Sequence, residues 1–211
     1  DAFVAAGGAE PDGHRDAIVM VRELERVGRR LAAQQVAVVE AIDRQGFAYV
    51  LYDNGELFRV STKNAACLRT NYQPGQLEWP VFGMGFASDE NGNDQLFVSP
   101  PPRGTPNAEG LGTINLTDLR LSKIGDYRPN VVQQAELTGT GDGHLYAYWP
   151  GRAVGTTGHF VAELDRKTAR VTSISHDPTP SPVLNSIAFA YWGGAFWIFN
   201  GHDQQTDVTK F

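Results

Sequence analysis

The stretch FAYVLYDNGELFRVS (residues 47–61) holds two apolar runs separated by Asp53, Asn54 and Gly55. An Asn-Gly pair between two such runs is a strong β-hairpin signal, because both residue types tolerate positive φ. The same pattern recurs in VFGMGFASDENGNDQLFVS (81–99), QAELTGTGDGHLYAYW (134–149) and SIAFAYWGGAFWIFN (186–200). The apolar pairs after the turns begin at Leu57, Leu96, Leu145 and Phe196, at separations of 39, 49 and 51 residues. The chain is therefore predicted to repeat a hairpin unit.

A second hairpin follows the first in the middle units. LGTINLTDLRLSKIG (111–125) and FVAELDRKTARVTSI (160–174) both read as strand, short polar turn and strand, with Ile114 and Leu164 in corresponding places. A four-stranded unit repeating every ~40–50 residues is typical of β-propeller blades, which must stack on their neighbours to bury both faces. We expect a mainly β fold with about four blades over residues 47–211, of which the first and last are incomplete.

The segment before the blades has a different period. Apolar residues spaced by three and four form one stripe, and Gly46 stands where a helix would take its left-handed stop. This pattern predicts one long amphipathic α-helix over residues 15–46, preceded by a flexible lead-in at 1–14. The helix packs on the blades or pairs with the helix of a second chain to form a homo-oligomer. The stripe comprises Ala17, Val21, Leu24, Gly28, Leu31, Gln35, Val38 and Ile42.

Composition excludes several classes of protein. With 18 Lys+Arg against 24 Asp+Glu among 211 residues, the net charge is −6, which disfavours a nucleic-acid surface. No apolar run approaches the ~20 residues of a membrane-spanning helix. The single cysteine, Cys67, excludes an internal disulfide. Cys67 is interpreted either as a small buried residue or as half of a bridge to a cysteine outside this chain.

Two motifs suggest ligand loops but fail on detail. Asp89, Asn91 and Asn93 match the first ligands of a calcium loop, yet the sixth position is Asp94 and no glutamate follows at the twelfth. A polar hairpin turn fits better. The glycine-rich run at 139–143 leads into a strand, so no helix N-terminus is available for a phosphate. No metal and no cofactor are predicted.

No catalytic residues are predicted either, since the chain has no G-x-S-x-G motif and no two histidines share a metal-ligand spacing. Two tryptophans next to prolines are expected to be exposed in loops, and four polar loop residues could meet at the central channel. Alternating aromatics such as Tyr146 and Tyr148 suit inter-blade packing, although a carbohydrate-binding platform uses the same residue types. The candidate ligand-binding residues are Trp79, Asp142, His144, Trp149, His202 and Asp203.

The repeat units also resemble a known group of proteins. The segments AYVLYDNGELFRVST, FGMGFASD, LFVS, GLGTINLTDL, AELTGTGDGHLYAYW, VAELDRKTA, FAYWGGAFWIFN and the closing VTKF are similar to secreted or lipoprotein-like β-propeller proteins of proteobacteria, best represented in myxobacteria. The resemblance covers residues 47–211 and implies a propeller fold in an extracellular or cell-envelope protein. Members of that group are longer at both ends, and their extra strands are expected to complete the ring. This chain is predicted to carry a helix in place of the upstream strands.

The predicted helix has a separate resemblance. RELERVGRRLAAQQVAVVEAIDRQG (22–46) is similar to the helical N-terminal region of actinobacterial repeat proteins that often carry a C-terminal HNH nuclease. This chain contains no His-Asn-His cluster, so no nuclease activity is expected from it.

Three functions are consistent with these observations. The first is a non-catalytic recognition scaffold of the cell envelope or exterior that binds a protein or glycan at one face of the propeller. The second is a propeller hydrolase or lyase with its polar loop residues at the central channel. The third is an assembly module that oligomerises through the helix. The absence of a nucleophile motif or a metal spacing favours the scaffold. No nucleic-acid partner and no membrane span are expected.

Overall fold

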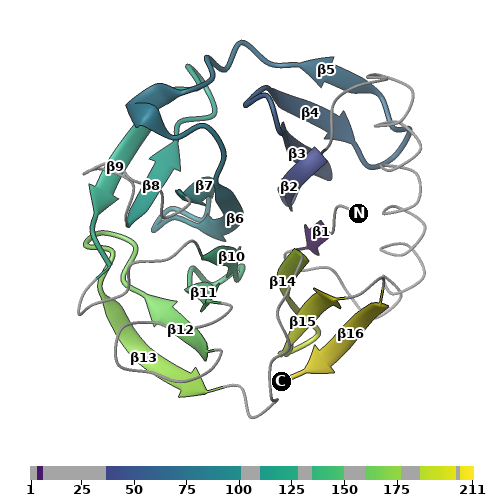
Figure 1. Cartoon of the computed structure of the whole chain (residues 1–211). Coiled ribbons are helices and arrows are strands. Elements are labelled where there is room, and N and C mark those ends of the chain that lie inside the picture. The colour runs from purple at the N-terminus through teal and green to yellow at the C-terminus, as the bar shows by residue number, and fades with distance from the viewer. Residues whose placement is uncertain are drawn as a thin grey trace.

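The computed structural model describes residues 4–6, 37–100, 110–127, 135–149, 160–176, 186–202 and 205–211. They form four β-sheets arranged around a common centre (Figure 1). Within each sheet the strands follow one another in chain order, and the earliest strands lie innermost. The protein is thus a four-bladed β-propeller, which confirms the repeated hairpin unit predicted from the sequence.

Antiparallel strands build each blade. Blade 1 consists of β2 (Ala37–Ile42), β3 (Phe47–Tyr52), β4 (Leu57–Ser61) and β5 (Cys67–Arg69), and a short 3-10 turn, η1 (Gln76–Glu78), follows it. Blade 2 consists of β6 (Gly83–Ser88), β7 (Asp94–Ser99), β8 (Leu111–Ile114) and β9 (Leu121–Gly125). Blade 3 consists of β10 (Glu136–Gly139), β11 (Leu145–Trp149), β12 (Phe160–Leu164) and β13 (Val171–His176). Blade 4 consists of β14 (Ser186–Trp192), β15 (Ala195–His202) and β16 (Gln205–Lys210).

The ring closes through one additional strand. β1 (Val4–Ala6) pairs in parallel with β2, with Val4 opposite Glu40 and Ala6 opposite Ile42. It also contacts β14, so the innermost strands form a continuous circle of contacts from β2 through β6, β10, β14 and β1. The prediction that the first blade is incomplete is wrong, because β2 supplies its innermost strand. In the fourth blade the described residues form three strands.

The predicted helix is wrong over residues 37–42, which form β2, and the predicted lead-in is wrong at Val4–Ala6, which form β1. Residues 7–36 lie outside the described residues. Apolar residues spaced by three and four also occur in strands that are buried on both faces, so the stripe did not separate the two structures. Val38, Val39 and Ile42 are β-branched and favour a strand. Gly46, at φ 81°, takes the left-handed position of a hairpin turn rather than of a helix stop.

Glycines let the innermost strands of blades 2 and 3 approach one another at backbone distance. A Cβ atom at Gly83 would lie 2.1 Å from the carbonyl oxygen of Ala135, and one at Gly85 would lie 2.6 Å from that of Leu137. Seen from β10, a Cβ atom at Gly139 would lie 2.2 Å from the carbonyl oxygen of Phe86. No side chain fits at such distances, which makes glycine necessary at all three positions.

Apolar side chains fill the interfaces between successive blades. Tyr49, Trp79 and Phe82 belong to the core between blades 1 and 2. A core of thirteen buried residues lies between blades 2 and 3 and includes Phe97 and Trp149. Between blades 3 and 4 the described core is smaller and consists of Tyr148, Val161, Phe189 and Ile198.

The opposite face of blade 1 carries a further apolar cluster, formed by Ile42, Ala48, Val50, Tyr52 and Val60. Cys67 packs against this cluster and is half-buried, and burial raises the pKa of its thiol. Among the described residues, no helix is long and apolar enough to cross a membrane.

Candidate functional site

One face of the ring carries the turns that join the first two strands of each blade, and we call it the turn face. Three of these turns share one geometry, in which a residue with a side-chain oxygen is followed three positions later by a glycine at positive φ. Asp43 Oδ1 accepts hydrogen bonds from the amides of Gln45 (3.0 Å) and Phe47 (2.8 Å). Thr140 Oγ1 likewise accepts one from the amide of His144 (3.0 Å). Such side-chain acceptors stabilise a tight turn.

The third such turn contains the residues that match a calcium loop. Asp89 Oδ1 accepts hydrogen bonds from the amides of Asn91 (2.8 Å) and Asn93 (2.7 Å), and Oδ2 accepts one from the side chain of Asn93 (3.2 Å). The Asn93 amide and side chain lower the pKa of this carboxyl. Both carboxylate oxygens therefore serve the turn, which confirms the prediction of a polar hairpin. In the described part of the chain, no group of three or more His, Cys, Asp or Glu side chains could hold a metal ion.

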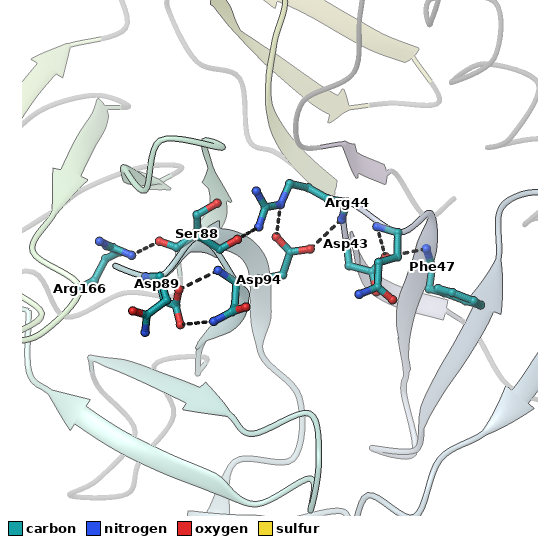
Figure 2. A network of polar contacts seen from close by, with 11 residues as sticks. Asp43, Arg44, Phe47, Ser88, Asp89, Asp94 and Arg166 are labelled. Atoms are coloured by element: carbon teal, nitrogen blue, oxygen red, sulfur yellow. Dashed lines mark hydrogen bonds and ion pairs between the residues drawn. The ribbon is translucent and has the colours of Figure 1, made fainter.

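Cations from both neighbouring blades bind this β6–β7 turn (Figure 2). From blade 1, the Arg44 side chain pairs with Asp94 Oδ1 at 2.5 Å and donates to the carbonyl oxygen of Gly92. From blade 3, Arg166 donates to the carbonyl oxygen of Ser88. Side chains on the turn face thus fix blade 2 between its two neighbours.

A histidine and two carboxylates lie together further round the turn face. His144 Nδ1 lies 2.6 Å from Glu163 Oε1, and His144 Nε2 lies 3.9 Å from Asp142 Oδ2. The His144 side chain is 48% exposed and that of Glu163 is 31% exposed. The hydroxyl of Thr140 donates to Asp142 and lowers the pKa of its carboxyl. The structure therefore brings together Asp142 and His144, two of the predicted ligand-binding residues.

A row of aromatic rings continues from His144 across the interface between blades 3 and 4. The His144 ring stacks on Tyr146 with centroids 6.2 Å apart, and Tyr146 stacks on Tyr191 at 6.2 Å. Phe196 packs against Tyr146 at 4.8 Å, and Phe211 lies 6.4 Å from Phe196. We call the set of His144, Glu163, Tyr146, Tyr191, Phe196 and Phe211 the His144 surface.

Most rings of the His144 surface are partly exposed. Tyr146, Tyr191 and Phe196 are half-buried, and Phe211 is 37% exposed. Burial raises the pKa of the Tyr146 hydroxyl, and the neighbouring Glu163 raises it further. The hydroxyl therefore stays protonated at neutral pH and remains a hydrogen-bond donor.

The two predicted exposed tryptophans are buried, so that prediction is wrong. Trp79 and Trp149 both have 0% exposure. The Trp79 ring lies over Gly112, where a Cβ atom would be only 2.8 Å from it. Trp149 ends β11 and stacks on Phe160 at 4.9 Å. A neighbouring proline marks the end of a strand or a linker, but the adjacent tryptophan still anchors that segment in an inter-blade core.

The predicted convergence of polar loop residues at the channel is also wrong. His202 ends β15, whereas Trp192 and Ala195 flank the β14–β15 turn on the turn face. Seven residues of strand span about 23 Å. His202 therefore lies at the end of blade 4 that is opposite to the turn face, where His144 lies in blade 3. Asp203 lies outside the described residues.

Sequence reasoning missed two further charged residues. Glu136 lies buried on the innermost strand β10, and burial raises its pKa to about 8. Arg59 lies on β4 two positions after the buried Leu57 and on the same side of the strand. For Arg59 the available signal was a charged residue on the same side of its strand as the buried Leu57. Glu136 shares its side of β10 with Thr138, so no such signal was available there.

No protein-family model and no curated protein matches the chain. Several solved structures are similar to the chain at low sequence identity. Kuenenia stuttgartiensis hydrazine synthase has a TM-score of 0.46 at 13% identity, over 77% of this chain and 43% of that one. A Bacteroides caccae protein of unknown function has a TM-score of 0.47 at 13% identity, over 85% of this chain and 65% of that one. A glycoside hydrolase has a TM-score of 0.47 at 12% identity, over 83% of this chain and 45% of that one.

The chain spans less than two thirds of the length of each of these three proteins. Similarity at these identities and TM-scores indicates no shared function. The activities named for two of these proteins therefore do not bear on the His144 surface.

Proposed function

We propose that this protein is a non-catalytic recognition scaffold that binds a glycan at the His144 surface. The observation that carries the proposal is the continuous row of half-buried rings that ends at the exposed His144, which pairs with the half-buried Glu163. A buried inter-blade core needs no such exposed rings, and an exposed apolar patch edged with polar groups is typical of a binding surface.

The chemistry of the surface suits a sugar. Aromatic faces bind the apolar C–H side of a pyranose ring, while neighbouring polar groups pair with its hydroxyls. Tyr146 and Tyr191 supply parallel rings with an interplanar angle of 22°. Glu163 and Asp142 accept hydrogen bonds from hydroxyl groups, and the Tyr146 hydroxyl donates one.

The hydrolase or lyase alternative rests on one observation, the 2.6 Å contact between His144 and Glu163. A carboxylate next to an imidazole can accept a proton in general-base catalysis. However, His202 lies at the opposite end of its blade, so the four predicted polar residues do not form one catalytic centre. Release of reducing ends from a bound polysaccharide would favour this alternative over the scaffold.

The wider setting of the protein rests on the resemblance to exported propeller proteins. We place the scaffold at the cell exterior or in the cell envelope, where glycans are abundant. The proposal needs no cofactor, no nucleic acid and no second copy of the chain.

Affinity gel electrophoresis tests the proposal with laminarin, xylan, mannan and polygalacturonate as immobile probes. At least one polysaccharide should retard the full chain. Tyr146→Ala should then weaken binding about tenfold, because it removes the central ring of the row. Ile174→Ala serves as a matched control, since Ile174 is 50% exposed on β13 of the same blade but lies outside the row. The proposal is wrong if no polysaccharide retards the chain, or if Tyr146→Ala behaves like the control.

A further inference from the structure

A groove of about 1000 Å³ opens between blades 1 and 2. Blade 1 lines it with Tyr49, Arg59 and Arg69, and the turns of blade 2 line it with Asp94, Leu116 and Leu119. The His144 surface lies between blades 3 and 4, so the groove is a separate place on the molecule. An inference about it does not depend on the proposed function.

Two of the three arginines that line the groove already have anionic partners. Arg44 pairs with Asp94 at the rim, as Figure 2 shows. Arg69 pairs with Glu56, and its side chain is 64% exposed. The positive charges of these two side chains are therefore largely neutralised, and they should attract an anionic ligand only weakly.

Arg59 differs from both. Its guanidinium carbon lies 3.4 Å from the centroid of the Phe47 ring, and its Nε atom is buried without a hydrogen-bond partner. No Asp or Glu among the described residues forms an ion pair with it. Asp43 also lines the groove, where its Oδ1 accepts the amides of Gln45 and Phe47, and its carboxylate keeps its charge but forms no ion pair with Arg59. Arg59 forms a side-chain hydrogen bond with Tyr49. It is a half-buried cation with no anionic partner among the described residues.

A guanidinium held in this way favours a carboxylate. The Phe47 ring fixes the plane of the group and stabilises its charge. A planar carboxylate matches the paired N–H donors of arginine, and removal from water strengthens the pairing. Of the three arginines that line the groove, Arg59 alone has no ion-pair partner among the described residues, so the site suits one negative group rather than several.

Part of the remaining wall of the groove is apolar, and the rest is lined by Gln45, Thr70, Asn71 and Asn93. Leu116 and Leu119 are half-buried against the core of blades 1 and 2, and Leu68 is 69% exposed on β5. A ligand that contacts these side chains would remove apolar surface from water. The volume of the groove lies within the range of small-molecule sites.

We infer that the groove between blades 1 and 2 binds a small monocarboxylic acid with an apolar body. The carboxylate pairs with Arg59, and the apolar body lies against Leu116 and Leu119. The groove thus gives the propeller a second, anion-selective binding site.

Isothermal titration calorimetry of the full chain tests the inference, with 4-phenylbutyrate as the probe. The acid should bind, and its uncharged amide of the same shape should bind at least about tenfold more weakly, because a charge-assisted pair is lost. This comparison uses the unchanged protein, so it does not depend on the folding of any variant.

Variants then test whether Arg59 is the residue that pairs with the carboxylate of the ligand. Arg59→Gln should weaken binding of the acid about tenfold or more, and Arg59→Lys should restore only part of it, since lysine keeps the charge but not the planar donors. Arg69→Gln is the matched control, because Arg69 lines the same groove but pairs with Glu56, and it should change binding less than about twofold.

Three results would overturn the inference. The first is equal binding of acid and amide, or no binding of either. The second is an unchanged affinity in a folded Arg59→Gln variant. The third is inorganic phosphate binding as tightly as the acid, which would show that the groove selects charge without an apolar body.

Discussion

The two faces of strand β10 make very different interfaces. On one side, Leu137 and Gly139 face blade 2 across an apolar core, where backbone meets backbone at the glycines. On the other side, Glu136 and Thr138 face blade 4, where Thr138 Oγ1 accepts a hydrogen bond from the amide of Tyr191 at 3.0 Å. That interface also contains the hydrogen bond from the Tyr148 hydroxyl to Asn200 Oδ1 (3.3 Å).

The difference indicates that one interface of a propeller can hold the blades together while another carries a binding surface. Backbone contact leaves no room for adjustment, so the interface between blades 2 and 3 can act only as a support. Polar groups and half-buried rings can exchange a protein contact for a contact with a ligand. The interface between blades 3 and 4 contains both kinds of group, and it opens onto the His144 surface. The proposed glycan site therefore lies at the interface with the smaller described core.

The largest effect should come from removing one ring at each interface. Phe160 is 1% exposed between blades 2 and 3, whereas Phe196 is half-buried between blades 3 and 4. Phe160→Ala should cost about 4 kcal/mol and Phe196→Ala about 2 kcal/mol, since a cavity costs more where less can relax. Urea denaturation measures both. Equal losses would remove the distinction between the two interfaces.

The next effect concerns the glycine contact. Gly139→Ala should destabilise the protein by about 3 kcal/mol, because overpacking against a backbone carbonyl forces the strands apart. Gly141→Ala is the control, since a Cβ atom there would have nothing within 4 Å. The control should change stability by less than about 0.5 kcal/mol. A Gly139→Ala variant as stable as this control would show that β6 and β10 can separate freely.

A pH titration tests the polar interface between blades 3 and 4. The folded pKa of Glu136 is raised to about 8 from the usual 4.5, so between these values the folded state holds a proton that the unfolded state has lost. Stability should therefore fall as pH rises from about 5 to 8, by about 2 kcal/mol or more, and then level off. In Glu136→Gln this decline should disappear. An identical pH profile in the two proteins would mean that Glu136 is ionised in the folded state.

The smallest effect should come from the polar contacts across the turn face. Arg166→Gln removes the hydrogen bond to the Ser88 carbonyl, yet the core beneath it remains, so the loss should be about 1 kcal/mol or less. Thermal unfolding measures it. Lys167→Gln, which removes an exposed ion pair with Glu90, is the control and should leave the melting temperature unchanged. If Arg166→Gln lowers stability as much as Gly139→Ala does, the polar contacts of the turn face contribute as much to stability as the backbone contact between blades 2 and 3.

The sequence was sufficient for the repeat because tight turns impose local rules. The Gly193-Gly194 turn has φ values of 59° and 78°, and Gly55 has φ 79°, as a hairpin requires. Ile114 and Leu164 occupy corresponding positions before like turns, as predicted. At Asn54 the reason differs from the expected one, because its side chain accepts a hydrogen bond from the Glu56 amide (3.0 Å) instead of taking positive φ.

The remaining features depend on contacts between distant segments. β2 becomes a strand because β3 and β1 pair with it, and its local spacing of apolar residues also fits a helix. Asp142 and His144 were proposed as ligand-binding residues from the turn that carries them. Their partner Glu163 and the ring of Tyr191 come from other strands. Arg59 required knowledge of which side of β4 faces blade 2. In each case the missing information was the spatial neighbour, which no short stretch of sequence contains.

The shared turn geometry described for Asp43, Asp89 and Thr140 bears on how such chains can change over evolution. Strand residues need only remain apolar on the correct side, so many substitutions are tolerated and overall similarity fades quickly. The oxygen acceptor and the glycine three residues later have few substitutes, because one closes the turn and the other adopts positive φ. Remote relatives should therefore keep an oxygen acceptor followed three residues later by a glycine in the first turn of blades 1, 2 and 3 after most other positions have diverged.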